Sequence, residues 1–176
     1  LVIYIPKNEV VKAPIRIENT LSGEQDTMVV RRILVIMEEN AEATIFFVDH
    51  TRGEKKYLTS QVIEVFCKAN SHLDMYDLEE TTEQCSRFSN LYISAERDVV
   101  INHNNITLSN GITRNAIDVF LQGENAHSLG FTHSIFIMRI VCQTYEVTSQ
   151  FLCPRQQGMG IFCRVCPAAA VWLLFM

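Results

Sequence analysis

Apolar side chains recur at alternate positions in short segments of this chain, and polar turns rich in Asn, Asp, Glu and Gly separate the segments. Successive side chains of a strand point to opposite faces, so apolar residues two apart share one face. β-Branched and aromatic residues, which favour strands, are common in these segments. The predicted strands are residues 29–37, 43–48, 61–66, 73–76, 90–93 and 117–121. No stretch of this region keeps a helical period with caps, so the pattern predicts an all-β fold.

One polar turn recurs at a nearly constant interval. Its four copies are spaced 30, 28 and 27 residues apart and are centred on Asn40, Asn70, Asp98 and Asn125. The residues five before each centre are apolar: Val35, Val65, Ile93 and Phe120. If each repeat is one circuit of the chain, these residues stack coil above coil in a continuous core, as in a β-solenoid. Asn and Asp suit such a corner because they tolerate left-handed backbone geometry.

The fourth copy of the repeat is the weakest. The residues seven before the first three centres are Ile33, Ile63 and Leu91, and those three after them are Ala43, Leu73 and Ile101. In the fourth copy these positions hold Asp118 and Ser128. A β-sandwich with irregularly spaced turns therefore stays open as an alternative.

Composition narrows the class of protein. The 176 residues are long enough for one domain with a core, and 48% of them are apolar. A net charge of −5 leaves no basic stripe for a phosphate backbone, so we expect no nucleic-acid partner. The longest uncharged run near the end, residues 165–176, is shorter than the roughly 20 residues of a membrane-spanning helix, so we expect no membrane association.

The first residues carry no recognisable signal sequence. The apolar start, residues 1–6, is followed at once by Lys7 and Glu9, and the chain begins without Met, which indicates a fragment. We therefore expect a cytoplasmic, reducing environment in which the cysteines of the body are free thiols. Cys67 stands in an apolar run, where a small buried side chain is the default expectation.

The character of the chain changes near residue 128. Residues 129–176 hold four charged side chains, and the preceding 128 residues hold the other 31. The same tail contains four of the six cysteines and the single Trp, and the repeat does not continue through it. We predict a β-helix core over residues 1–128 and an irregular, atypical tail over residues 129–176, which is either out of frame or disordered.

The tail contains one metal-like pattern. Cys163 and Cys166 form a Cys-x-x-Cys pair, and Cys153 precedes them by ten residues. Thiolates at this spacing can share a metal, and further ligands could complete a zinc or iron–sulfur site. No second Cys-x-x-Cys is present, so the three cysteines are candidates only, and an accidental pattern is favoured.

The histidines give weaker signals. His127 and His133 could pair as ligands across a turn, but no carboxylate lies near enough in sequence to orient either ring, so surface histidines are favoured. His103 lies between two asparagines, which predicts a solvated turn or the outer face of a coil.

An acidic run could suggest acid–base chemistry or calcium binding; it comprises Asp74, Asp77, Glu79 and Glu80. It lacks the Asp-x-Asp-x-Asp-Gly pattern of a calcium loop, so a solvated coil edge is the better interpretation. Isolated glycines exclude a Gly-rich phosphate loop. We therefore expect no catalytic residue, and a protein that is not an enzyme.

Four stretches resemble the SufD branch of the SufB/SufD family of iron–sulfur cluster assembly. They are residues 31–45, 57–81, 86–93 and 104–126, of which the last is the most specific, with its Thr-Arg-Asn and Gly-Glu-x-Ala segments. The resemblance implies a right-handed parallel β-helix, in agreement with the repeat. It also implies a non-catalytic scaffold in a cytoplasmic complex with SufB-like and SufC-like proteins. In that complex the SufC-like protein hydrolyses ATP and the complex handles the cluster, so no cofactor is assigned to this chain.

The chain departs from the family after Ala126, where further coils and a His-containing segment are expected. We hypothesise that a frameshift produced the tail and truncated the family's sequence. Two other functions stay open: a metal- or cluster-binding protein that uses Cys153, Cys163 and Cys166, and a β-helix enzyme acting on carbohydrate.

Overall fold

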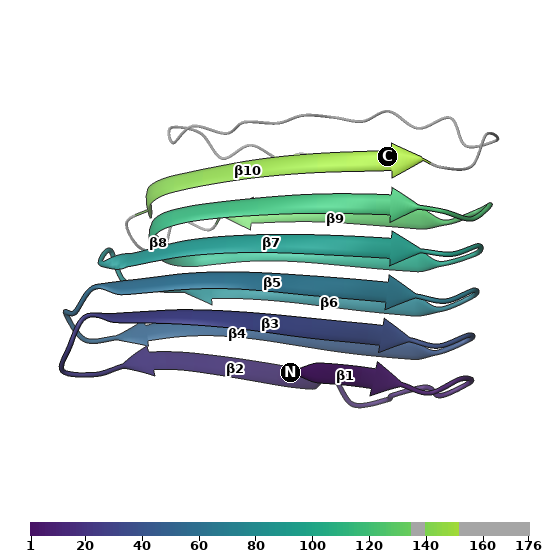
Figure 1. Ribbon diagram of the computed structural model, residues 1–176, viewed down its shortest axis with the longest axis horizontal. Coiled ribbons are helices and arrows are strands. Elements are labelled where there is room, and N and C mark those ends of the chain that lie inside the picture. Colours follow the sequence, from purple (N-terminus) through teal and green to yellow (C-terminus); the bar gives the residue numbers. More distant parts are fainter. Residues whose placement is uncertain (135–139, 152–176) are drawn as a thin grey trace.

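Ten parallel strands make up the fold in this computed structural model, which describes residues 1–134 and 140–151 (Figure 1). No helix occurs in the described residues. The strands are β1 (Val2–Ile5), β2 (Ile15–Ser22), β3 (Thr27–Met37), β4 (Glu42–Arg52), β5 (Tyr57–Cys67), β6 (His72–Glu80), β7 (Cys85–Ala95), β8 (Val100–Leu121), β9 (His127–Ser134) and β10 (Ile140–Phe151).

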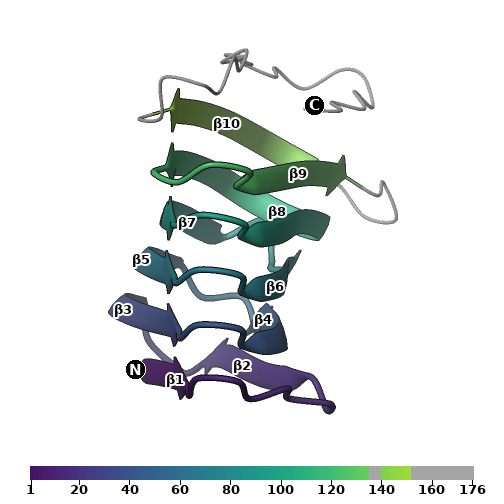
Figure 2. The same ribbon diagram turned by 90° about the vertical axis from the view of Figure 1, so that its right-hand side faces the viewer.

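Each strand from β1 to β6 pairs in parallel with the strand two elements later, which is the connectivity of a solenoid, and β8 also pairs with β7, β9 and β10. One wall, here called sheet A, contains β1, β3, β5, β7, the second half of β8, and β10. The opposite wall, sheet B, contains β2, β4, β6, the first half of β8, and β9. The long strand β8 bends from one wall to the other, and the chain rises as a right-handed coil (Figures 1 and 2). The predicted right-handed parallel β-helix is confirmed.

Asparagine and aspartate occupy the corner that leads from sheet A to sheet B. Asn40, Asn70, Asp98 and Asn125 have φ values of 57°, 60°, 58° and 56°, so the left-handed geometry predicted for all four is confirmed. Asn8, with φ 61°, forms a fifth corner that the repeat analysis missed. The corner side chains also connect neighbouring coils, since the Asn40 Nδ2 donates to Asn8 Oδ1 at 2.7 Å.

The register of the fourth repeat differs from the prediction by one residue. Val119, and not Phe120, stacks on Ile93 and lies in the core. The last corner is one residue longer than the corner before it, and Gly123 lies in it against the backbone of Arg97, where a Cβ has no room. An alignment centred on Asn125 therefore shifts every position of the preceding strand onto the wrong face.

The main apolar core fills the half of the solenoid next to the asparagine corners, and a small second cluster of Leu21, Tyr57 and Cys85 lies at the opposite ends of the strands. Ladders of aliphatic side chains run through the main core, such as Val35, Val65, Ile93 and Val119 on successive strands of sheet A. Cys67 belongs to the main core and is 1% exposed, as predicted from its apolar run.

The coils continue past residue 128 with β9 on sheet B and β10 on sheet A, both paired with β8. The proposed boundary at residue 128 itself stays a prediction. Across the described ranges, no helix is long and apolar enough to span a membrane.

Candidate functional site

The half of the interior away from the asparagine corners is polar. In β3, β5 and β7 of sheet A, inward polar positions precede the inward aliphatic ones, as in β5, where Thr59 and Gln61 precede Ile63 and Val65. Sheet B mirrors this order because its strands run the opposite way across the interior. Asp49, at the far end of β4, therefore lies in the same half of the interior as the first residues of β5. We call this region the polar half of the interior.

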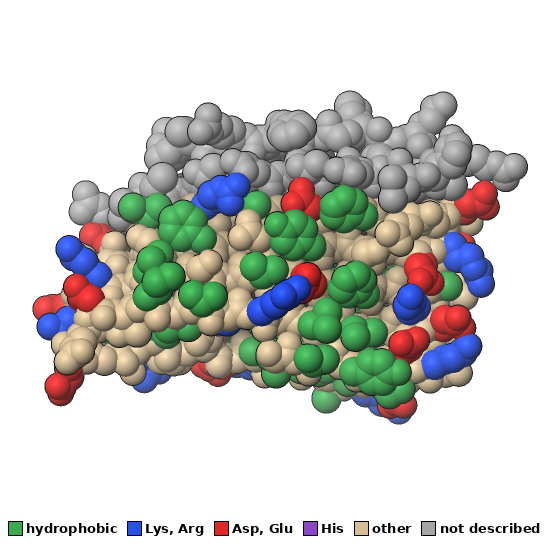
Figure 3. All heavy atoms as spheres, in the orientation of Figure 1, with side chains coloured by type: hydrophobic (Ala, Val, Ile, Leu, Met, Phe, Trp, Pro, Cys, Tyr) green, Lys and Arg blue, Asp and Glu red, His purple; other side chains and the backbone are tan. Residues whose placement is uncertain are grey.

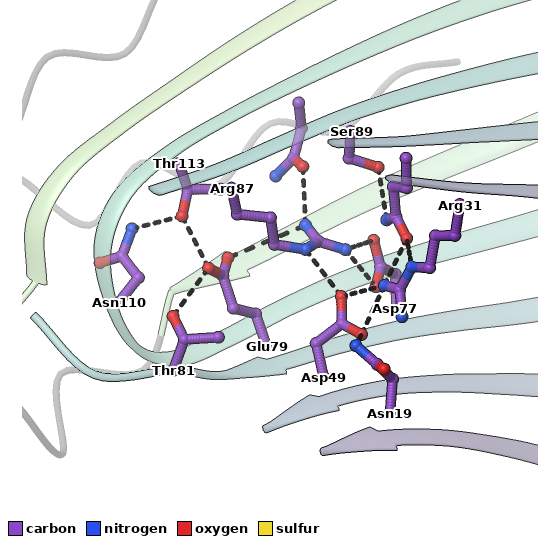
Figure 4. Close-up of polar contacts among 12 residues, drawn as sticks. Asn19, Arg31, Asp49, Asp77, Glu79, Thr81, Arg87, Ser89, Asn110 and Thr113 are labelled. Carbon is purple, nitrogen blue, oxygen red and sulfur yellow. Dashed lines mark hydrogen bonds and ion pairs between the residues drawn. The ribbon is translucent and has the colours of Figure 1, made fainter. Parts of the chain in front are cut away.

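Arg87 lies at the centre of the polar half and is 1% exposed. Its Nη2 donates to both carboxylate oxygens of Asp77 at 2.8 and 2.7 Å, and its Nε donates to Asp49 Oδ2 at 2.9 Å. Its Nη1 donates to Asn115 Oδ1 at 2.9 Å and lies 3.9 Å from Glu79 Oε2 (Figure 4). These partners come from β4, β6 and β8, so one guanidinium joins three further strands to β7.

A second arginine extends the network toward the first coils. Arg31 binds the carboxylate of Asp49, and its Nε donates to Gln61 Oε1 at 2.8 Å. Gln61 in turn donates to Ser89 Oγ at 2.7 Å. Burial by itself raises the pKa of Asp49, but Arg87 and Arg31 outweigh that effect and hold the pKa below its usual range. Asp49 is thus ionised and shared between two arginines.

Of the buried carboxylates in this network, Glu79 has the weakest contact with an arginine. Its Oε1 accepts hydrogen bonds from Thr81 Oγ1 at 3.1 Å and from Thr113 Oγ1 at 2.7 Å. Its Oε2 has no hydrogen-bond partner, and the side chain is 1% exposed. Burial raises the pKa of Glu79 to about 7, because the opposing charge of Arg87 offsets only part of the lost hydration.

His103 also lies inside the solenoid, 4% exposed, on the first half of β8. Burial lowers its pKa to about 4, so the ring is neutral near pH 7. The prediction of a solvated turn or an outer face is wrong, because inward and outward positions alternate along β8 and place His103 inward between outward Asn102 and Asn104.

The acidic run 74–80 is divided between the two faces of β6. Asp77 and Glu79 point inward and are buried, whereas Asp74 and Glu80 lie on the outer face. Interpreting the whole run as a solvated edge is therefore wrong for two of its four members. The countercharge that makes their burial possible is Arg87, a residue that the sequence analysis did not single out.

The candidate metal ligands Cys153, Cys163 and Cys166 lie outside the described residues, so their assignment stays a prediction. Of the two candidate histidines, His127 begins β9 and is exposed, while the side chain of His133 is not described. The structure therefore does not test whether they pair.

In the described residues, the charged side chains of the polar half mainly contact one another. Arg31 and Arg87 pair with its aspartates, and no group of three or more His, Cys, Asp or Glu side chains in the described ranges could hold a metal ion. Burial raises the pKa of Cys67 to about 12 and that of Cys85 to about 11, which opposes formation of the thiolate that a metal or cluster binds. This arrangement of the described residues ties neighbouring coils together.

Comparison with known proteins gives one match. Residues 19–137 match the model of the family described as SUF system FeS cluster assembly, SufBD core domain. No curated protein and no solved structure matches the chain.

Proposed function

The chain belongs to the SufBD core domain family of the SUF system, and from this membership in iron–sulfur cluster assembly we propose that it is a non-catalytic scaffold of the assembly complex. Within that family we assign it to the SufD branch, with SufB-like and SufC-like proteins as partners. The cluster is then the cargo of the complex, and ATP hydrolysis belongs to the SufC-like partner. The cytoplasm is the proposed location.

The observation that carries this proposal is the family match over 119 residues of a β-solenoid. Two features of the interior support a scaffold over a cluster-binding protein. The charged side chains are held in ion pairs within the chain, and both described cysteines are buried thiols with raised pKa values. A scaffold needs a stiff body of this kind and does not need an open ligand set.

Co-purification tests the scaffold role. The full chain carrying an affinity tag is co-expressed with the SufB-like and SufC-like proteins of the same source, and we expect the SufB-like protein to co-purify in a fixed ratio. A folded chain that captures neither protein would overturn the proposal. Because the resemblance to the family implies that the segment that contacts the SufC-like protein lies beyond residue 128, we expect weaker capture of that partner.

Anaerobic reconstitution with iron and sulfide separates the scaffold from the cluster-binding alternative. We expect the isolated chain to gain no stoichiometric visible absorbance. A cluster that forms in the unmodified chain and is lost in a Cys163→Ser/Cys166→Ser variant would favour direct cluster binding by the tail and count against the scaffold role.

A further inference from the structure

The outer face of sheet A is apolar, flat and exposed. Outward side chains on β1, β3, β5, β7 and the second half of β8 are mostly aliphatic or aromatic, and many of them are well exposed in Figure 3. Val30 is 70% exposed, Met28 62%, Phe66 44% and Tyr92 41%. A soluble monomer rarely exposes a contiguous apolar patch of more than a few hundred Å², so this face has the character of an interface.

The outer face of sheet B is different and serves as the internal comparison. Polar side chains contact one another across its strands: His50 lies 3.2 Å from a carboxylate oxygen of Glu18 and 3.0 Å from one of Glu80. Its Asp74 accepts a hydrogen bond from Asn102 at 2.7 Å. A face whose polar groups already pair with one another and with water gains little from being covered. Sheet A is therefore the wall that favours association.

Among the strands of this face whose side chains are described, β1 to β8, the outward charges are few and balanced. They comprise Arg32, Glu64, Arg114 and Asp118, two of each sign. Arg32 donates to Glu64 at 2.7 and 2.9 Å, and this pair lies among apolar neighbours near the middle of the face. A neutral face with a central pair of opposite charges is complementary to itself, because each charge finds its opposite on a second copy.

We propose that the outer face of sheet A is a self-association surface that takes a second copy of this chain in a two-fold, face-to-face dimer. Arg32 is in register with Val62 on β5, two residues before Glu64. A two-fold axis that runs along the strands between β3 and β5 sets Arg32 over Val62 of the second copy. Glu64 of the second copy then lies two residues along the strand from the position that faces Arg32. Arg32 and Glu64 bridge the same offset within one chain.

The area of the outer face of sheet A is close to the area that a protein dimer buries on each copy. Strands of 11 residues, as in β3, β5 and β7, are about 36 Å long at about 3.3 Å per residue. The four long strands of the face (β3, β5, β7 and the second half of β8), at about 4.8 Å each, cover a width of roughly 20 Å, which gives an area of roughly 700 Å². A stable protein interface buries about 800 Å² on each partner. The face therefore offers nearly the area that a dimer needs.

Sedimentation velocity of the full chain tests the proposal over about 1–100 µM, since interfaces of standard size associate at micromolar concentration or more tightly. We expect a monomer–dimer equilibrium. In a Phe66→Lys/Tyr92→Lys variant, two ammonium groups enter the apolar face, and dimerisation should weaken roughly 100-fold. A Thr44→Lys variant is the matched control, because Thr44 is an outward strand residue of sheet B, and it should leave dimerisation unchanged. Circular dichroism checks that each variant is folded.

Charge reversal tests the two-fold arrangement. Arg32→Glu alone and Glu64→Arg alone each place like charges opposite one another in both copies, so each should weaken the dimer. The double reversal restores opposite charges and should restore dimerisation. A strictly monomeric chain, a dimer that survives Phe66→Lys/Tyr92→Lys, or species larger than a dimer would each overturn the proposal.

Capture of the SufB-like protein by the same variants keeps this inference apart from the proposed function. We expect the Phe66→Lys/Tyr92→Lys variant to lose dimerisation and retain capture. If the variant loses capture while the unmodified chain is monomeric, the face belongs to that partner, and the second copy is the wrong occupant.

Discussion

Arg87 shows how a full charge can be stable inside a solenoid. It donates hydrogen bonds to two carboxylates and an amide, and a third carboxylate lies 3.9 Å away. Removing a charge from water costs several kcal/mol, and a buried pair offsets that cost only when its geometry is good and its remaining donors are satisfied. Here residues of neighbouring coils supply the acceptors for Arg87, so the network depends on the stacking that it stabilises.

Replacing Arg87 by Met should be strongly destabilising. The variant leaves Asp49 with one arginine and leaves Asp77 with none, and breaking a buried pair in this way costs about 3–5 kcal/mol. Urea denaturation measures the free energy of unfolding. Arg97→Met is the control, because Arg97 is an exposed corner residue paired with Asp98, and it should cost less than about 1 kcal/mol. Equal losses of unfolding free energy in the two variants would contradict a stabilising role for the Arg87 network.

Glu79 and His103 should impose opposite pH dependences on stability. The folded-state pKa of Glu79 is about 7, above its ordinary 4.5, so its contribution is fully present below pH 4.5 and is lost as pH rises to 7. The folded-state pKa of His103 is about 4, below its ordinary 6.5, so its contribution is present above pH 6.5 and is lost as pH falls to 4. Each effect is on the order of 3 kcal/mol, and their windows overlap. The unmodified chain should therefore show a shallow profile between pH 4.5 and 7.

A Glu79→Gln variant should reveal the pH dependence of stability that His103 alone imposes. Its free energy of unfolding should rise steadily from pH 4.5 to 6.5 and exceed that of the unmodified chain above pH 7. His103→Gln should show the reverse slope. Urea titrations at half-unit pH steps measure both, and parallel profiles for Glu79→Gln and the unmodified chain would contradict this account.

Sequence reasoning found the period of these residues but assigned several of them to the wrong face. The alternation in β6 is visible, yet it permits either Asp77 and Glu79 or Tyr76 and Leu78 to point inward. Charged side chains are usually solvated, and that expectation favoured the wrong choice. The correct choice depends on Arg87 in the next coil, and a single strand contains no information about its neighbour.

At the scale of elements, the corners were the most predictable part of the fold. A left-handed residue at each corner favours Asn or Asp, and the aliphatic positions beside it recur because each coil must stack on the last. Asn8 was missed because it stands 32 residues before Asn40, outside the narrow interval of the other copies. The extra residue in the last corner was missed because Asn125 still occupies its place while the strand before it is displaced by one.

Gly111 should be required at the bend of β8. A Cβ at this position would overlap the backbone carbonyl oxygens of Cys85 and Glu83, which cannot move without disturbing β7. Gly111→Ala should therefore lower the free energy of unfolding by about 1–3 kcal/mol or more. Gly23→Ala is the matched control, since nothing lies within 4 Å of a Cβ there, and it should be near neutral. Thermal denaturation compares the two, and a neutral Gly111→Ala would contradict the steric account.

At the scale of the whole molecule, the described coils behave as one body because each is paired along its length with the next. Strands β5 and β7 are in register from Tyr57 with Cys85 to Cys67 with Ala95, and the arginine network crosses the same coils. In a solenoid, strong coupling between neighbours makes unfolding cooperative.

Cys67 and Cys85 report on that cooperativity, since both are buried and lie on successive strands of sheet A. Pulsed alkylation at increasing urea, read by peptide mass spectrometry, should label the two thiols at the same urea concentration. An exposed thiol introduced as Ser22→Cys should react without urea and serves as the control. Labelling of one native thiol well before the other would show that the coils open independently.

The division of the interior into an apolar half and a polar half also fixes the register of each coil on the next. Aliphatic ladders alone permit a strand to slide by two residues, because inward positions stay inward and one branched side chain replaces another. In β7 such a slide would carry Arg87 away from Asp49 and Asp77, or bring Leu91 among the charges. Apolar stacking alone is therefore compatible with several registers of a strand. The ion pairs form only in the native register, so they select it.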